Sequence, residues 1–363
     1  MKLYSYFLIA AGLFSACQLG DKSIAQESLP LAPKIDTARL SLLFVGDLMN
    51  HSPQTSAAYD YRTKQYNYDT CYYWVKDYLS KPDISIANLE VTLAGYPYTG
   101  YPMFSAPDAY AVAAKNAGFD YFFTSNNHTC DKKLKGVVRT LDVLDSLKIE
   151  HTGSFRNIEE RNANYPSVVE KNGIKLVFLN ATYGTNGMPI PSPSVVNLLD
   201  SVQLKADFDK AKSLNPDFII MGVHWGNEYQ RTPSADQKKW ADFFIRNGAN
   251  LIIGSHPHVV QTYERRNGVP VIYSLGNFIS NQRDRYKDGG IAYEIELMKS
   301  EGKTQIVSHS YQAIWVQKQQ YPKVVYRLIP EDFKADSLLN PTEKLAWKTF
   351  VQDTRKHFVL DSL

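Results

Sequence analysis

From residue 39 onward, short apolar runs alternate with amphipathic stretches. Apolar runs bounded by polar residues predict buried strands, and they lie at residues 40–45, 84–87, 119–124, 175–179, 218–223, 251–253, 271–274 and 291–297. Stretches with helical periodicity predict helices at residues 69–79, 106–117, 134–147, 204–213 and 234–246. Strand–helix alternation with short connections predicts a layered α/β fold.

The last part of the chain is less regular than the rest. Residues 304–316 and 323–328 are predicted to be strands, and residues 341–357 a terminal helix. We therefore expect a main domain over residues 39–300 and a C-terminal extension, residues 301–363, packed on that same domain.

The N-terminus has the pattern of an export signal. Lys2 precedes an apolar run from Leu3 to Ala16, which is shorter than the ~20 residues of a membrane-spanning helix and is typical of a signal peptide over residues 1–16. Phe14-Ser15-Ala16-Cys17 resembles a bacterial lipobox. This predicts lipidation at Cys17, a polar tether over residues 17–38, and a membrane-anchored lipoprotein of the cell envelope that faces the periplasm or the outside. An ordinary secretory signal with a coincidental cysteine is the alternative.

Charge and cysteine content bear on nucleic-acid binding and on disulfide formation. The 363-residue chain has a net charge of +3 and no basic cluster, which argues against nucleic-acid binding. After Cys17, the cysteines are Cys71 and Cys130. A disulfide is compatible with export, but two buried free thiols fit equally well.

Polar residues of metal-ligand type follow six of the predicted strands: Asp47, Glu90, Asn127 with His128, His224, His256 with His258, and Asn277. Ligands of open α/β sheets bind beyond the carboxyl ends of the strands, and imidazole and carboxylate are ligands of zinc, manganese and iron. Taken singly, Asp47 fits a turn or a helix cap and His224 fits a packed core histidine. Their shared position at strand ends predicts one polar site that holds a metal ion or a metal pair.

Six short motifs, in one order over residues 40–298, resemble the CapA family of bacterial capsule and poly-γ-glutamate synthesis proteins. They are Val45-Gly46-Asp47-Leu48-Met49, Asn88-Leu89-Glu90, Asn126-Asn127-His128, His224-Trp225-Gly226 with Glu228-Tyr229, Gly254-Ser255-His256-Pro257-His258, and Tyr273-Ser274-Leu275-Gly276-Asn277-Phe278. The resemblance implies a calcineurin-like metallophosphoesterase fold, which is a four-layer α/β/β/α sandwich.

The resemblance also implies roles for individual residues. The expected metal ligands are two carboxylates, an amide oxygen and three histidines: Asp47, Glu90, Asn127, His224, His256 and His258. Asp47 corresponds to the carboxylate of the first motif. Glu90 corresponds to the bridging carboxylate, at a position where the superfamily usually has Asp. His128 is implied as the catalytic residue over the leaving group rather than as a ligand. Met49 stands where the first motif usually has His, and His51 is the candidate that replaces it as a ligand.

Other residues near these motifs are expected to support the site or to meet the substrate. Asn88, Trp225, Glu228 and Asn277 are the candidates for this supporting or substrate-binding role. The segment 183–187 has the composition of a substrate loop or of a plain turn, and Arg283 and Arg285 fit either an anionic substrate or a solvated basic loop. His151, His309 and His357 are not assigned to the site.

Two hypotheses about function follow. The first is an enzyme of capsule or poly-γ-glutamate biosynthesis, a metal-dependent hydrolase or transferase that uses one or two divalent ions (Mn, Fe or Zn) on an anionic envelope polymer or its precursor. The second is a non-catalytic component of the same fold that binds or exports the polymer. A structural lipoprotein without metal is a third alternative. A capsule-synthesis membrane complex is the expected assembly, with no nucleic-acid partner.

Overall fold

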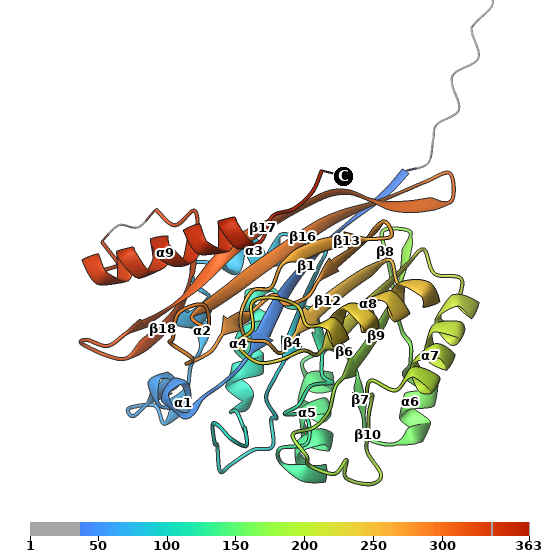
Figure 1. Ribbon diagram of the computed structural model, residues 1–363. Coiled ribbons are helices and arrows are strands. Elements are labelled where there is room, and N and C mark those ends of the chain that lie inside the picture. The colour runs from blue at the N-terminus through green and yellow to red at the C-terminus, as the bar shows by residue number, and fades with distance from the viewer. Residues whose placement is uncertain (1–36, 335–336, 363) are drawn as a thin grey trace, which may run out of the picture. The chain divides into compact units, whose positions relative to one another are not determined.

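The computed structural model describes residues 37–334 and 337–362 of the chain. The predicted signal peptide, the lipidation site Cys17 and the predicted tether up to residue 36 lie outside the described residues. One compact unit extends from Asp36 to Leu363, and its architecture is shown in Figure 1. In the described part of the chain, no helix combines the length and apolar character that crossing a membrane requires.

The larger sheet carries the first half of the site. Its strand order is β18-β17-β16-β1-β4-β5-β6, with β15 paired to the end of β1. The strands are β1 (Thr37–Leu48), β4 (Ile84–Leu89), β5 (Tyr121–Phe123), β6 (Glu150–Thr152), β15 (Asn277–Ile279), β16 (Gly289–Ser300), β17 (Lys303–Gln319) and β18 (Val325–Pro330). Because β1, β4, β5 and β6 pair in parallel, their carboxyl ends meet at one edge.

The smaller sheet repeats this arrangement. Its order is β13-β14-β12-β11-β9-β8, formed by β8 (Ser167–Lys171), β9 (Ile174–Thr182), β11 (Phe218–His224), β12 (Leu251–Ser255), β13 (Tyr263–Arg266) and β14 (Val269–Ile272). The four inner strands β9, β11, β12 and β14 are parallel. Two short pairs join β2 (Tyr59–Asp60) to β3 (Gln65–Tyr66), and β7 (Ser154–Phe155) to β10 (Val195–Val196).

The two sheets pack face to face through one apolar core. Phe44 and Ile86 of the larger sheet and Phe178 and Ile220 of the smaller sheet belong to this core and are almost fully buried. The ring of Tyr121 stacks on Phe178 across it, with 4.5 Å between ring centroids. Continuous burial on both faces explains why these strands appear in the sequence as unbroken apolar runs.

Helices cover both outer faces and complete four layers, α/β/β/α, as expected. The larger sheet packs on α2 (Asp69–Tyr72), α3 (Lys76–Ser80), α4 (Asp108–Ala117) and α5 (Lys133–Ser146); the smaller sheet packs on α7 (Ser201–Ser213) and α8 (Ala235–Asn247). The short helices α1 (Ser52–Ala58) and α6 (Ile158–Asn164) follow β1 and β7.

The single helix predicted over residues 69–79 is two helices. The break falls at Tyr73, Trp74 and Val75, and aromatic and β-branched residues lose rotamer freedom in a helix. The amide of Val75 bonds to the carbonyl of Tyr72, three residues back, at 2.9 Å. A tight turn therefore replaces the continuous helical ladder.

Residues after 300 extend the larger sheet and add a helix. β17 and β18 continue the sheet from β16, and α9 (Pro341–His357), which has the predicted bounds, begins with a capping box between Asn340 and Glu343. Phe350 of α9 packs with Trp315 and Ile329.

Cys71 and Cys130 are both buried free thiols. The sequence left open either a disulfide or two free thiols, and the structure has two free thiols.

Candidate metal centre

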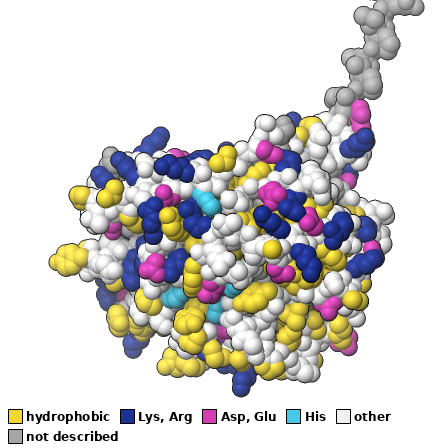
Figure 2. Space-filling model, in the orientation of Figure 1, with side chains coloured by type: hydrophobic (Ala, Val, Ile, Leu, Met, Phe, Trp, Pro, Cys, Tyr) yellow, Lys and Arg dark blue, Asp and Glu magenta, His cyan; other side chains and the backbone are white. Residues whose placement is uncertain are grey.

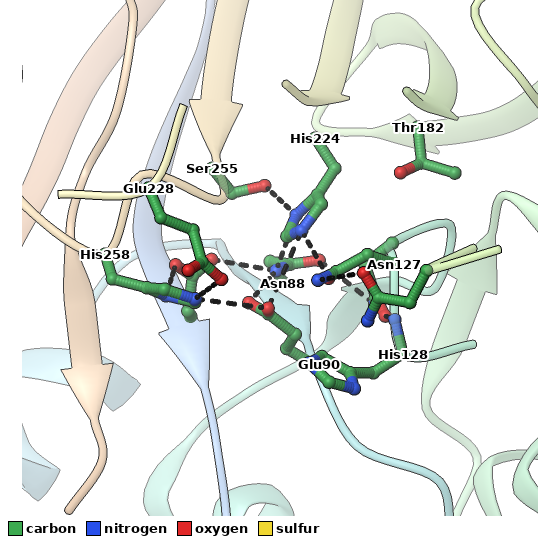
Figure 3. Close-up of polar contacts among 12 residues, drawn as sticks. Asn88, Glu90, Asn127, His128, Thr182, His224, Glu228, Ser255 and His258 are labelled. Carbon is green, nitrogen blue, oxygen red and sulfur yellow. Dashed lines mark hydrogen bonds and ion pairs between the residues drawn. The ribbon is translucent and has the colours of Figure 1, made fainter. Parts of the chain in front are cut away.

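Acidic, amide and imidazole side chains meet where the parallel strands of both sheets end (Figure 3). Asp47 lies near the end of β1, and Glu90 directly follows β4. From the smaller sheet, His224 ends β11, and His256 and His258 follow β12. Four segments that are distant in sequence thus contribute to one cluster because both sheets point their carboxyl ends toward it.

Asn88 holds the two carboxylates together. Its Nδ2 donates to Asp47 Oδ1 at 2.8 Å and to Glu90 Oε2 at 3.2 Å. Both carboxylates are fully buried, and Glu90 Oε1 has no hydrogen-bond partner. A buried carboxylate oxygen without a partner carries a large desolvation cost, which a cation at this position would offset.

Glu90 Oε1 faces two imidazoles. It lies 3.6 Å from His224 Nε2 and 3.7 Å from His258 Nε2. His224 Nε2 also lies 2.9 Å from Asn127 Oδ1, and its Nδ1 lies 2.9 Å from Ser255 Oγ. These partners fix the ring with one nitrogen toward Glu90, which is the arrangement that outer partners give to metal-binding histidines.

Three groups of potential ligands overlap. Their members are Glu90, His224 and His256; Asp47, Glu90 and His258; and Glu228, His256 and His258, with the ligand atoms of each group within 4.8 Å of one another. Glu90 is shared by the first two groups. A carboxylate shared in this way is placed to bridge two ions.

Burial keeps His224 and His256 in the neutral form, which is the form of histidine that binds metal. Desolvation lowers the pKa of His224 well below its usual value and lowers that of His256 to about 3. Desolvation, and next the charge of Asp47, raise the pKa of Glu90 well above its usual value. Neutral imidazoles are ready to ligate, whereas the carboxylate needs a cation to be stable as an anion. The buried Nδ1 of His256 also lacks a partner. The residues present therefore fit divalent metal ions with nitrogen and oxygen ligands.

The loop that carries two of the histidines has an uncommon backbone. His256 has φ +96° and His258 has φ +57°, in the left-handed region that residues other than glycine rarely adopt. Such conformations persist where the surroundings enforce them, and they cluster at functional sites. Here the backbone turns both rings toward the carboxylates.

His128 is held beside the cluster by a carboxylate. Its Nδ1 lies 2.8 Å from Asp131 Oδ2, which also accepts the backbone N–H of Phe104 at 2.7 Å. The Phe104 ring meets the imidazole edge-on, with 4.6 Å between centroids. With a carboxylate as its partner, Nδ1 is the nitrogen that donates, and Nε2 is left free of this contact.

Sequence reasoning missed two of these partners. Asp131 lies three residues after His128 and in the same turn, so the spacing was an available signal. Ser255 stands inside the motif that contributes His256 and His258. The contact of Ser255 is not visible without the fold, because its partner His224 comes from another strand.

Several predicted residues lie apart from the three groups. His51 caps α1: its Nδ1 lies 3.2 Å from Gln54 Oε1 and accepts the N–H of Asn281 at 3.3 Å. Trp225 points into the core under α8, where its Nε1 donates to the carbonyl of Tyr273 at 2.8 Å. Asn277 pairs with Asp47 in the sheet.

Asn277 Nδ2 donates to the carbonyl of Lys287 at 2.9 Å and thereby holds the loop after β15. Within that loop, Arg283 is partly buried and donates to the carbonyl of Val316 at 2.7 Å. Arg285 forms an ion pair with Asp353 of α9. Both arginines therefore contact the C-terminal part of the chain instead of the metal centre.

The segment 183–187 does lie against the cluster. The Tyr183 ring is 4.6 Å from the ring of His256, between centroids, and Asn186 Oδ1 accepts from Asn127 Nδ2 at 3.2 Å. Tyr183 is 45% exposed. This segment therefore forms part of the rim between the buried ligands and solvent.

On the face shown in Figure 2, a few histidine side chains reach the surface among hydrophobic and charged side chains. Fold and site together define a two-sheet α/β protein with a buried carboxylate–histidine centre of metal-binding type. The chain belongs to the bacterial capsule synthesis protein family PGA_cap, whose family model matches residues 41–282.

Two named relatives agree with this family. The chain is 28% identical over 272 residues to the capsule biosynthesis protein CapA of Bacillus anthracis, covering 70% of this chain and 64% of that protein. It is 23% identical over 348 residues to the PGA biosynthesis protein CapA of Bacillus subtilis, covering 91% of this chain and 85% of that protein. The match thus spans less than two thirds of the Bacillus anthracis relative.

Among solved structures, the calcineurin-like phosphoesterase YfkN of Bacillus subtilis is similar over 88% of this chain and 98% of that chain, with a TM-score of 0.46 and 13% identity. The fold assignment rests on the sheets and layers described above.

The shifted histidines predict how stability depends on pH. The pKa of His256 falls to about 3 and that of His51 to about 4, against about 6.5 in an unfolded chain. At these two groups the unfolded state therefore binds more protons below pH 6.5, so their contribution to the free energy of unfolding of the metal-free protein should fall as pH drops through this window, by up to about 1.4 kcal/mol per pH unit per group. The raised pKa of Glu90 acts in the opposite direction, because there the folded state binds the extra proton. Urea unfolding in EDTA at pH 7.5, 6.5 and 5.5 measures the resulting dependence on pH.

The matched variant for this experiment is His256→Asn, which removes one of these groups and should flatten the slope below pH 6.5. An identical slope in the variant and the wild type would contradict the prediction.

Proposed function

We propose that this protein is a metal-dependent hydrolase or transferase of bacterial capsule or poly-γ-glutamate biosynthesis, acting on an anionic envelope polymer or its precursor. The observation that carries the proposal is the buried oxygen Glu90 Oε1, which lacks a hydrogen-bond partner and faces His224 and His258 at 3.6 and 3.7 Å. A purely structural carboxylate would be hydrogen-bonded or solvated.

The residues have distinct roles in this proposal. Glu90 would be shared between two ions, with Asp47 and His258 on one side, and Asn127, His224 and His256 on the other. Divalent ions held there, of manganese, iron or zinc, would lower the pKa of bound water and supply hydroxide near neutral pH.

His128 supplies the proton chemistry. Since Asp131 accepts from its Nδ1, Nε2 is the nitrogen that can hold a proton and deliver it to a leaving group. Asp131 stabilises the protonated imidazole, and the edge of Phe104 keeps the ring from turning. This arrangement favours turnover over simple polymer binding, because binding alone does not require a positioned proton donor.

We also propose an envelope location. The support is the apolar run before Cys17 and the names of the two relatives, which refer to capsule and PGA biosynthesis. In this proposal a lipid on Cys17 holds the domain at a membrane, where a growing polymer and the membrane proteins that make it are within reach.

The proposal predicts a specific metal content. The purified full chain, incubated with Mn²⁺, Fe²⁺ or Zn²⁺ and desalted, should retain close to two equivalents by inductively coupled plasma mass spectrometry. Glu90→Gln should lose both, because the shared oxygen becomes neutral. Since burial already raises the pKa of Glu90, the metal-free fold should accept the neutral amide.

His151→Ala is the matched control for metal content, because His151 pairs with Asp145 outside the cluster and its removal should leave the content unchanged. Wild-type protein that holds no metal under any of these conditions would refute the metal-dependent proposal.

The role of His128 predicts a separate defect. His128→Ala should lower kcat on a phosphodiester or on poly-γ-glutamate by about 10²–10⁴-fold, with metal content retained. Asp131→Asn should lower it less, since the imidazole loses the carboxylate that orients it. Assays of both variants beside His151→Ala measure this.

If cells that carry only His128→Ala make normal amounts of polymer, the non-catalytic binding or export function replaces the enzyme. Reduced polymer together with retained metal supports the enzyme.

The lipid anchor predicts the result of fractionation. Wild-type protein should sediment with membranes and acquire labelled fatty acid, whereas Cys17→Ser should do neither and should accumulate as the unprocessed precursor. Processing of Cys17→Ser to a shorter, released form would instead indicate an ordinary secretory signal.

A further inference from the structure

The carboxylate of Glu228 lies next to His258 at the metal centre (Figure 3). Its Oε1 is 3.8 Å from His258 Nε2, and it forms a group with His256 and His258 whose ligand atoms lie within 4.8 Å of one another. The Glu228 side chain is 43% exposed, whereas that of His258 is 1% exposed. Glu228 therefore connects the buried ligands with solvent.

The spacing of these atoms is that of ligands and not of hydrogen-bonded pairs. His258 Nε2 lies 3.7 Å from Glu90 Oε1 and 3.8 Å from Glu228 Oε1, beyond hydrogen-bond range. Two ligand atoms that each lie about 2.1 Å from one ion are separated by roughly 3–4.2 Å, depending on the angle. The imidazole nitrogen thus lies within ligand-to-ligand distance of both carboxylate oxygens.

The backbone holds Glu228 in this place. The N–H of Trp225 donates to the carbonyl of Ser255 at 3.1 Å, and the N–H of Tyr229 donates to the carbonyl of Pro257 at 2.8 Å. Residues 225–229 are therefore tied at both ends to the loop that carries His256 and His258.

The turn in this segment is made at Gly226, which has φ +85°, and a Cβ there would lie 2.5 Å from the side chain of Gln237. Trp225, which is not directed at the site, anchors the start of the turn in the core. The exposed carboxylate is accordingly positioned by buried neighbours.

The group of Asp47, Glu90 and His258 shares His258 with the group of Glu228. Both oxygens of Asp47 already accept hydrogen bonds, from Asn88 at 2.8 Å and from His258 Nδ1 at 3.0 Å. Met49 stands where a first-motif histidine is expected, and a thioether is a poor ligand for ions that prefer nitrogen and oxygen. The ring nitrogen Nδ1 of His51 is engaged at the start of α1.

We propose that Glu228 is a metal ligand on the solvent side of His258, with which it shares the group that also contains His256. This inference rests on the proposed metal-dependent function. Because Glu228 is partly exposed, the ion that it holds is the more weakly bound of the two and the one that exchanges with solvent.

The test is a titration of the full chain with Mn²⁺ alone, with free Mn²⁺ measured by electron paramagnetic resonance. Wild type should bind a tighter and a weaker equivalent. Glu228→Gln should weaken the second equivalent by at least about ten-fold and leave the first unchanged, and Glu228→His, which offers an imidazole, should restore part of that affinity. Glu159→Gln, the same change at an exposed carboxylate of α6, should match wild type.

The outcomes separate this inference from the proposed function. If wild type binds two equivalents and Glu228→Gln binds both with unchanged affinity, Glu228 is not a ligand and the metal centre stands. If wild type binds no Mn²⁺, Fe²⁺ or Zn²⁺, both proposals fail. If a folded Glu228→Gln, checked by circular dichroism, loses both equivalents together, Glu228 supports the whole centre and its assignment to one ion is overturned.

Discussion

The rest of the site depends on one buried carboxylate. Glu90 is fully buried next to a second acid, Asp47, and one of its oxygens has no partner. Without a cation this arrangement is costly, as the raised pKa of Glu90 records. Packing between two sheets is what makes it tolerable: the apolar core lies just behind the strand ends and fixes the carboxylates so that they cannot move apart or reach water.

The topology explains why so many chain segments contribute to one small volume. In each sheet the central strands run in parallel, so every crossover returns the chain to the same edge, and the face-to-face packing brings the two edges together. Asn88 then links the sheets directly, because its Nδ2 approaches both Asp47 of the larger sheet and His224 of the smaller one, the latter at 3.3 Å. Local helix and strand formation thus determines which residues reach the site, and a few amide contacts determine their final distances.

Much of the fold could be predicted from sequence because its strands are buried on both faces and appear as continuous apolar runs, and because α9 begins with a clear capping box. Short strands such as β6 and β15 carry too few residues to leave a periodic signal. The residues that were predicted at strand ends are the ones that surround Glu90 in the structure. Sequence could not show that the Nδ1 of His51 is engaged at a helix cap, that Trp225 points into the core, or that Arg283 is partly buried against β17, because these outcomes depend on contacts between distant segments.

The position of Glu228 shows how such a centre can differ in its metal chemistry while its scaffold is kept. The first strand ends in Asp47 with Met49 after it, so the larger sheet contributes one ligand fewer at this corner than the resemblance implies. The smaller sheet contributes the loop 225–229, tied to the histidine loop by two backbone hydrogen bonds. With Glu228 as a ligand, a charged carboxylate would take the place of the neutral histidine of the first motif. This ligand would also lie on the solvent side of the centre and not on its buried side. If Glu228 is a ligand as proposed, more negative charge around the ion would reduce its power to polarise a bound oxygen. The exposure of Glu228 would at the same time give the proposed polymer substrate access to this corner, so the exchange would favour access over electrophilic strength.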